Sequence, residues 1–127
     1  MKYIKFILPG IILLTVILIF KMVFYIGYVP TESMEPTIPA QSRIIGIRIL
    51  GKLEVSDIIV FEHNGYYMVK RIAAVAGDTL EINGLKTKVP EDCYYVIGDN
   101  FLNSYDSRYW DNPFIKNKDI IAILFCK

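Results

Sequence analysis

The feature that most constrains the fold is an apolar run near the N-terminus that carries no charge from Phe6 to Phe20. As an α-helix, the eighteen residues of segment 3–20 span about 27 Å, close to the thickness of a bilayer's hydrocarbon core. Pro9 and Gly10 can kink such a helix without preventing it from spanning. The sequence therefore predicts an N-terminal membrane anchor at residues 1–21, with a transmembrane helix over about residues 3–20.

The residues that flank this apolar run indicate whether it is cleaved off and how it is oriented in the membrane. A cleaved secretory signal has the same basic start and apolar middle, but no small-x-small cleavage site follows here. The next stretch, KMVFYIGYVP at residues 21–30, is bulky and aromatic. We therefore expect an uncleaved anchor. Lys2 and Lys5 favour a cytoplasmic N-terminus with the remainder outside, although Lys21 on the far side weakens that bias.

Residues 22–127 are expected to form a compact, extracytoplasmic, mainly antiparallel β domain. Asn64-Gly65 and Asn83-Gly84 each lie between strand-like runs, which is a strong hairpin signal. Further strands are expected in the apolar stretches at residues 22–29, 43–50, 93–100 and 119–126. No long helical period appears in this part of the sequence.

Charge and cysteine usage exclude other classes of protein. Fourteen basic and thirteen acidic residues do not make the concentrated basic surface of a nucleic-acid binder. Cys93, Cys126 and the single histidine, His63, lack the spacing of a zinc site, and we expect no metal or other cofactor. Two ordinary thiols are the favoured reading of the cysteines, and the sequence leaves open whether they pair.

The stretch VPTESMEPTI, residues 29–38, places Ser33 between Pro30 and Pro36. Proline restricts the backbone, so a nucleophile held there need not be ordered on binding. A serine nucleophile needs a group that takes its proton. His63 precedes a hairpin turn, where an exposed loop role is expected, so it is a poor candidate base.

Lys70 is the alternative base, in the predicted strand YYMVKRIAAVAG at residues 66–77. Burial among apolar neighbours lowers a lysine's pKa from its reference of about 10.4, which makes the neutral amine available. Strand alternation sends Lys70 and Arg71 to opposite faces. From this spacing alone, an ordinary Lys-Arg pair on an edge strand is the better reading.

A third polar stretch, GDNFLNSYDSRYW at residues 98–110, lies between apolar strands. A loop with Asx turns has such a composition. Its Asp and Asn residues could also suggest a cation site, but the residue order of an EF-hand, with its central glycine and terminal glutamate, is absent.

Taken together, SMEPT (33–37), KRIAAVAGD (70–78) and GDNFLNSYDSRYW (98–110) resemble the conserved boxes of bacterial type I signal peptidases. SDIIVF (56–61) resembles a further, weaker box. The order and the preceding anchor also match, and the resemblance covers residues 25 to about 111. It implies a β domain of the signal peptidase/LexA-like type.

The resemblance also implies roles for single residues. Ser33 would be the nucleophile and Lys70 the general base, with the Thr31 hydroxyl and the Ser33 backbone N–H forming the oxyanion hole. Ser104 would orient the lysine amine. Asp106 and Arg108 would form an ion pair that stabilises the site, and Arg71 is expected to join them. The residues expected to line shallow substrate pockets for small side chains are Val29, Met34, Ile38 and Val69.

The function implied is a membrane-anchored serine endopeptidase that removes signal peptides from exported preproteins after small-x-small motifs. We expect it in a bacterial cytoplasmic membrane, with preproteins and the lipid bilayer as partners and neither nucleic acid nor metal. Two alternatives stay open: a dedicated processing peptidase for pilin or conjugation-pilus subunits, and a catalytically silent assembly protein on the same scaffold.

The sequence departs from the family pattern at two places. Gly77 and Gly98 are only 21 positions apart, where larger members insert an extra domain, so the chain is expected to be a minimal catalytic core. Asp111-Asn112 follows SRYW where the family often has glycine. Lysine at position 70 argues for the bacterial branch, because the endoplasmic-reticulum branch uses histidine.

Overall fold

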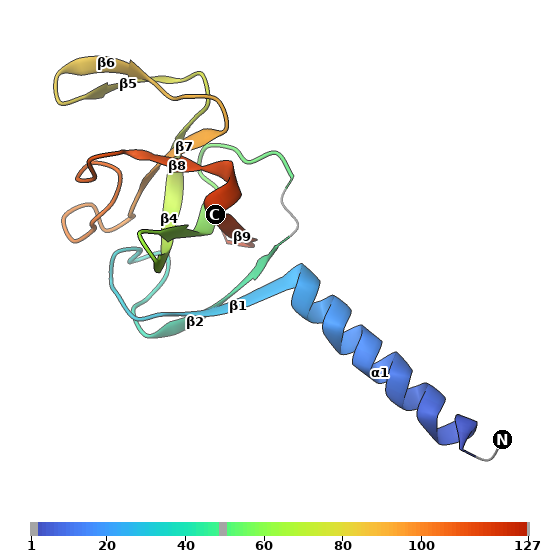
Figure 1. Ribbon diagram of the computed structural model, residues 1–127. Coiled ribbons are helices and arrows are strands. Elements are labelled where there is room, and N and C mark those ends of the chain that lie inside the picture. Colours follow the sequence, from blue (N-terminus) through green and yellow to red (C-terminus); the bar gives the residue numbers. More distant parts are fainter. Residues whose placement is uncertain (1–2, 49–50, 127) are drawn as a thin grey trace.

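A computed structural model describes residues 3–48 and 51–126 of the chain (Figure 1). One α-helix leads into a series of short strands. The elements, in chain order, are α1 (Ile4–Val23), β1 (Phe24–Val29), β2 (Ser42–Ile47), β3 (Ile58–His63), β4 (Tyr66–Val75), β5 (Thr79–Ile82), β6 (Leu85–Lys88), β7 (Cys93–Ile97), β8 (Phe114–Lys116), a 3₁₀ turn η1 (Asn117–Asp119) and β9 (Ile120–Leu124).

The strands form a seven-stranded sheet in the order β1-β2-β9-β3-β4-β7-β8 and a separate two-stranded hairpin, β5-β6. Every pairing between them is antiparallel. The hairpin projects at the end of the molecule opposite α1 (Figure 1). The expected fold class, a mainly antiparallel β structure preceded by an apolar helix, is confirmed.

Strand β3 explains where the core lies. Ile58 and Val60 belong to one cluster of buried apolar side chains, and Ile59 and Phe61 to a second. Successive side chains of a strand point to opposite faces, so β3 has a packed core on each side. This accounts for the unbroken apolar run at residues 58–61, which is typical of a strand segment covered on both faces rather than half-exposed.

Both predicted Asn-Gly hairpins form. Asn64 and Gly65 have φ angles of 50° and 82°, and Asn83 and Gly84 have 52° and 79°. Two successive positive φ values are typical of a type I′ turn, whose twist matches that of the flanking strands and which favours Asn-Gly. The turns fix the register of the β3–β4 and β5–β6 pairs, the former being the pair that carries Lys70.

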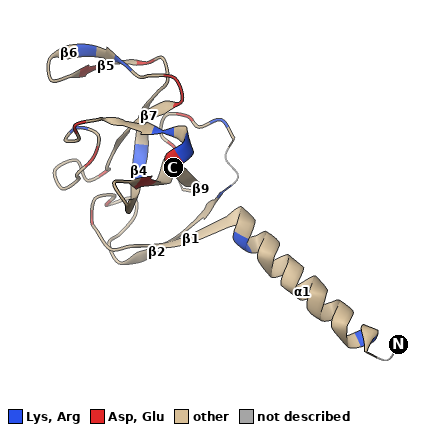
Figure 2. Cartoon of the chain, in the orientation of Figure 1, with Lys and Arg blue, Asp and Glu red and all other residues tan. Residues whose placement is uncertain are grey.

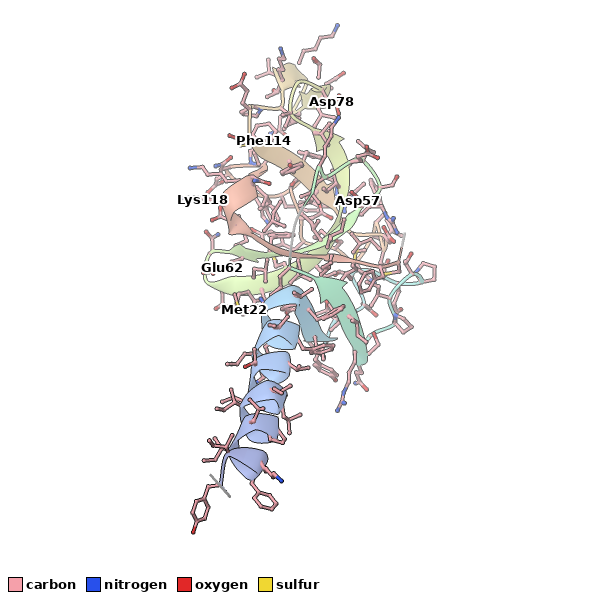
Figure 3. All side chains as sticks on the ribbon, turned by 90° about the vertical axis from the view of Figure 1, so that its right-hand side faces the viewer. Met22, Asp57, Glu62, Asp78, Phe114 and Lys118 are labelled. Atoms are coloured by element: carbon pink, nitrogen blue, oxygen red, sulfur yellow. The ribbon has the colours of Figure 1, made fainter. Side chains whose placement is uncertain are left out.

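Helix α1 stands clear of the sheet, and its side chains project outward along its length (Figure 3). None of its residues is buried, and it is long and apolar enough to cross a membrane. Its C-terminal end, near Met22, meets the start of β1 (Figure 3).

Several predicted boundaries differ from the structure. The strand expected at 22–29 begins at Phe24, because the helix continues through Val23. The strand expected at 43–50 is observed as β2, and residues 49 and 50 lie outside the described residues. Strands β7 and β9 end before the polar or terminal residues of their predicted stretches, and β8 was not predicted.

Candidate active site

Two buried polar side chains from distant parts of the chain meet at one point. Ser33 lies in the turn between β1 and β2, and Lys70 lies within β4. Lys70 Nζ is 2.6 Å from Ser33 Oγ, and the two residues are only 4% and 7% exposed. Thr31 Oγ1 lies 3.4 Å from the same Ser33 oxygen. The pair has the geometry of a nucleophile beside a base.

Burial lowers the pKa of the Lys70 amine below its ordinary value. The low-dielectric surroundings disfavour the ammonium form. The Asp106 carboxylate opposes this effect and raises the pKa, whereas the Arg108 guanidinium lowers it further. The net direction favours the neutral amine that a general base requires.

The turn that holds Ser33 is tied to the loop that follows β7. The backbone N–H of Asn100 donates to the Ser33 carbonyl oxygen at 3.0 Å, and Asn100 Nδ2 donates to the Glu32 carbonyl oxygen at 3.1 Å. Gly98 packs so closely that an added Cβ would lie 2.5 Å from the Ser33 carbonyl oxygen. These contacts fix the backbone at Ser33 relative to the loop that follows β7.

Asp106 is the centre of a hydrogen-bond network in the loop that follows β7, and it is fully buried, at 0% exposure. Its Oδ2 accepts from Ser104 Oγ at 2.7 Å, from the Gly98 N–H at 2.9 Å and from Arg108 Nη2 at 2.9 Å, while Oδ1 accepts from Arg108 Nε at 2.8 Å. Burial alone raises the pKa of Asp106, but these hydrogen bonds, led by those from Arg108, outweigh it and hold the pKa below its ordinary value.

Ser104 was expected to orient the lysine amine. In the structure its hydroxyl donates to Asp106, and no hydrogen bond joins it to Lys70 within the described residues. The electrostatic effect of Asp106 on Lys70 gives Ser104 an indirect route to the amine. Its direct orienting role stays a prediction.

Arg71 forms a second ion pair rather than joining the Asp106–Arg108 pair. Its Nε and Nη2 donate to the two carboxylate oxygens of Asp99 at 2.7 Å each, and Nη1 donates to the Ser56 carbonyl oxygen at 2.7 Å. The bidentate pair raises the pKa of Arg71 and lowers that of Asp99. Such a fork connects β4 to the loop after β7.

A pocket of about 140 Å³ lies beside the Ser33–Lys70 pair. The residues that line it come from β1, the turn after it, and β4: Tyr28, Val29, Pro30, Thr31, Ser33, Tyr67, Met68, Val69 and Lys70. Val29 and Val69 are thus on its wall, and their contact with substrate stays a prediction. Met34 and Ile38 lie in the core instead, at 0% and 4% exposure. Tyr28, Tyr67 and Met68 were missed, although they are sequence neighbours of Val29 and Val69.

His63 lies away from the pair. It is four residues along β3 from Ile59, the register partner of Lys70, which is about 13 Å in an extended strand. Its ring stacks on Trp110 with centroids 3.9 Å apart, and burial lowers its pKa. The described residues contain no group of three or more His, Cys, Asp or Glu that could hold a metal ion. Cys93 and Cys126 are unpaired.

Comparison with known proteins gives the family of the chain. The sequence pattern of the family described as "Signal peptidase, peptidase S26" matches residues 1–87 and 83–126. "Probable signal peptidase I-2" of Synechocystis is 30% identical, over 79% of this chain and 61% of the relative. "Signal peptidase I S" of Bacillus subtilis is 30% identical, over 72% of this chain and 70% of the relative. The chain therefore spans about two thirds of the length of these curated relatives.

A solved structure has a similar fold. The crystal structure of a signal peptidase I from Enterococcus faecalis superposes with a TM-score of 0.50 at 24% identity, covering 60% of this chain and 99% of that one. Since the family pattern covers almost the whole sequence and the fold agrees, the chain belongs to the signal peptidase family, peptidase S26.

Proposed function

We propose that this protein is a membrane-anchored serine endopeptidase that cleaves signal peptides from exported preproteins, with Ser33 as nucleophile and Lys70 as general base. The observation that carries the proposal is the 2.6 Å contact between Lys70 Nζ and Ser33 Oγ in a buried setting that lowers the lysine's pKa. Family membership supports the choice of substrate. The intact pair argues against a catalytically silent scaffold.

The reaction is an acyl transfer in two halves. Ser33 Oγ attacks the scissile carbonyl carbon while the neutral Lys70 amine takes the hydroxyl proton. The tetrahedral intermediate then collapses, the peptide C–N bond breaks, and the Lys70 ammonium gives its proton to the leaving amine. Water then attacks the acyl carbon while Lys70 takes a proton from it, the ester C–O bond breaks, and Lys70 returns that proton to Ser33 Oγ.

The oxyanion formed in each half needs hydrogen-bond donors. Thr31 Oγ1, 3.4 Å from Ser33 Oγ, is placed beside the atom that attacks. We assign the hole to this hydroxyl and to the Ser33 backbone N–H, which the Asn100 contact with the Ser33 carbonyl helps to hold in position. Donors fixed before the reaction stabilise the developing charge without reorganisation.

The substrate is proposed to add as a strand beside β4. Strand β7 pairs with β4 from Arg71 to Val75, and among the described residues the segment 66–70 is paired with β3 only. An extended peptide can hydrogen-bond to such an edge. Alternate side chains of a strand share a face, so the first and third residues before the cleaved bond point to the pocket and the second points away. This geometry gives the small-x-small rule.

In the proposed binding mode the pocket, about 140 Å³ in volume, takes the side chains of both the first and the third residue before the cleaved bond, which favours small side chains such as alanine. Val29 and Val69 form part of its wall, and Tyr28, Tyr67 and Met68 complete it. A larger side chain in the first position overpacks these residues, and each added methylene costs on the order of 1–3 kcal/mol.

The anchoring and topology are part of the proposal. Residues 1–21 serve as the anchor and residues 22–127 as the catalytic domain, with the end of α1 carrying the chain from the bilayer into β1. The chain would be single-pass in a bacterial cytoplasmic membrane, with the N-terminus inside and the site outside. Support comes from the length and exposure of α1 and from Lys5 near its start.

A precursor-cleavage assay with the full chain in detergent tests the function. Ser33→Ala and Lys70→Ala should each abolish cleavage, and the double variant should be no worse than either, because the pair acts as a unit. His63→Phe, which preserves stacking on Trp110, is the matched control and should cleave normally. Substantial cleavage by Lys70→Ala, or its loss in His63→Phe, would refute the assignment.

A further inference from the structure

Another cavity, which shares no lining residue with the pocket beside Ser33 and Lys70, lies where α1 meets the sheet. It has a volume of about 540 Å³. The residues that line it are Val16, Ile17, Phe20 and Lys21 of α1, Phe24 and Ile26 of β1, and Arg48 after β2. Positions 16, 17, 20 and 21 share one face of a helix, and positions 24 and 26 share one face of a strand. These residues form a mainly apolar groove whose lining also includes two basic residues, Lys21 and Arg48. We call it the junction groove.

The two basic residues of the junction groove lack acidic partners. Within the described residues neither Lys21 nor Arg48 forms an ion pair, whereas Arg71 and Arg108 each do. Two hydrogen bonds hold Arg48 at the groove. Its side-chain Nε donates to the Phe24 carbonyl oxygen at 3.1 Å, and its backbone N–H donates to the Val23 carbonyl oxygen at 2.7 Å. Its two terminal nitrogens stay available for a bidentate contact with an oxyanion.

The charge pattern of the sequence points the same way. Residues 1–31 and 36–53 contain six of the fourteen basic residues, and all thirteen acidic residues lie outside these two segments. The segments include α1, β1 and β2, which converge at the junction groove. Figure 2 shows basic positions at the two ends of α1 and no acidic position along it. An anionic ligand therefore meets no repulsion from these segments.

We propose that the junction groove binds an anionic phospholipid, with the headgroup phosphate at Lys21 and Arg48 and an acyl chain against Val16, Ile17 and Phe20. This proposal rests on the membrane anchoring of the proposed function, because a lipid reaches the groove only if α1 spans the bilayer. The phosphate lies near the last turn of α1, where the groove carries its two basic residues. The acyl chain lies along the side of α1, where the lining residues are apolar. The lipid joins the anchor to the β domain and limits their relative motion.

Lipid selectivity of the full chain in phosphatidylcholine vesicles tests the proposal. Electron paramagnetic resonance measures the motionally restricted fraction of a spin-labelled lipid, here phosphatidylglycerol or phosphatidylcholine. A basic residue near the membrane surface strengthens binding of an anionic partner about fivefold. We expect wild type to prefer phosphatidylglycerol by at least about fivefold, and Lys21→Gln/Arg48→Gln to lose that preference. Arg48→Lys, which keeps the charge, should retain most of it.

The matched control is Lys86→Gln/Lys88→Gln on β6, which removes the same charge far from the groove and should keep wild-type selectivity. Unchanged selectivity in Lys21→Gln/Arg48→Gln, or an equal loss in the control, would overturn the proposal. Displacement of the labelled lipid by millimolar inorganic phosphate would assign the groove to a free anion instead.

Flotation and cleavage separate this proposal from the proposed function. If wild type does not float with the vesicles, anchoring fails and the groove proposal fails with it. If it floats but shows no selectivity, only the groove proposal fails. Cleavage of a precursor in detergent micelles should be the same for wild type and Lys21→Gln/Arg48→Gln, since neither residue contacts the active site, and a loss there would show that the substitutions disturb the fold.

Discussion

Replacing Lys70 by methionine separates the proposed catalytic role of the amine from its effect on stability. Methionine has a similar volume and flexibility but no proton to give or take. Lys70 is 4% exposed, and its side chain is hydrogen-bonded to Ser33. We expect an inactive protein that is at least as stable as wild type at neutral pH.

The magnitude follows from two opposing effects. Keeping an ammonium buried costs several kcal/mol after relaxation, and the lowered pKa of Lys70 reports this cost. The substitution removes that cost and loses one hydrogen bond, worth about 1 kcal/mol. The Ser33 hydroxyl keeps Thr31 Oγ1 at 3.4 Å as a neighbour. The net gain in the free energy of unfolding is therefore expected to be at least about 1 kcal/mol, and each 1 kcal/mol raises the Tm of a domain of this size by about 4 °C.

The pH dependence gives the sign of the effect. The folded pKa of Lys70 lies below its unfolded value of about 10.4. Between the two values the unfolded chain binds the extra proton, so the stability of wild type rises with pH across this window. Below the folded pKa the penalty is constant, and above the unfolded pKa it is absent. The advantage of Lys70→Met should therefore be greatest on the acid side of the window and vanish above it.

The assay is thermal unfolding of both proteins in the same detergent at several pH values. Lys88→Met, on the exposed hairpin β5–β6, controls for the general effect of removing a positive charge and should show no comparable gain. A Lys70→Met protein that is clearly less stable than wild type at pH 7 would mean that Lys70 is a structural ion-pair partner, and the reasoning from burial would be wrong.

Three further predictions concern the surroundings of the pair. Thr31→Val should lower kcat by roughly 10²–10³, the usual effect of removing one oxyanion donor, while Thr31→Ser keeps most activity; normal turnover by Thr31→Val in the precursor assay would place the oxyanion elsewhere. Arg108→Gln removes a cation that lowers the pKa of Lys70, so the alkaline rise of its pH–rate profile should move to higher pH; a shift to lower pH would contradict the assigned electrostatics. Gly98→Ala places a methyl group against Ser104 and the Ser33 carbonyl and should destabilise the fold by about 1–3 kcal/mol, measured by thermal unfolding; an unchanged Tm would show that the loop yields freely.

Local chemistry accounts for the parts of the fold that were predicted. The Asn-Gly pairs specify two turns because both central residues need positive φ. The length and apolarity of segment 3–20 specify a helix. Boundaries were less accurate: α1 continues to Val23, because Met22 and Val23 fit a helix as well as a strand, and packing decides between them.

The candidate site, like the fold, was predicted only in part from the sequence. The approach of Ser33 to Lys70 was inferred from the family resemblance. Local sequence patterns do not predict the order of strands in a sheet, and β1 and β4 are not neighbours in this one. Met34 was expected on the pocket wall, but an apolar side chain beside a nucleophile can turn either to substrate or to the core, and here it is fully buried. The pairing of Arg71 with Asp99 depends on how the loop after β7 folds back.

The protonation of the Lys70 amine is the property on which the proposed mechanism depends most directly. Nitrogen-15 NMR of lysine-labelled full chain in detergent can follow it against pH, with the Lys70→Met spectrum assigning the signal and the urea-unfolded chain as reference. We expect Lys70 to lose its proton at lower pH in the folded protein than in the unfolded one, and the rate of precursor cleavage to rise with the same midpoint. Equal midpoints in the two states, or a cleavage rate that does not follow the titration, would contradict it.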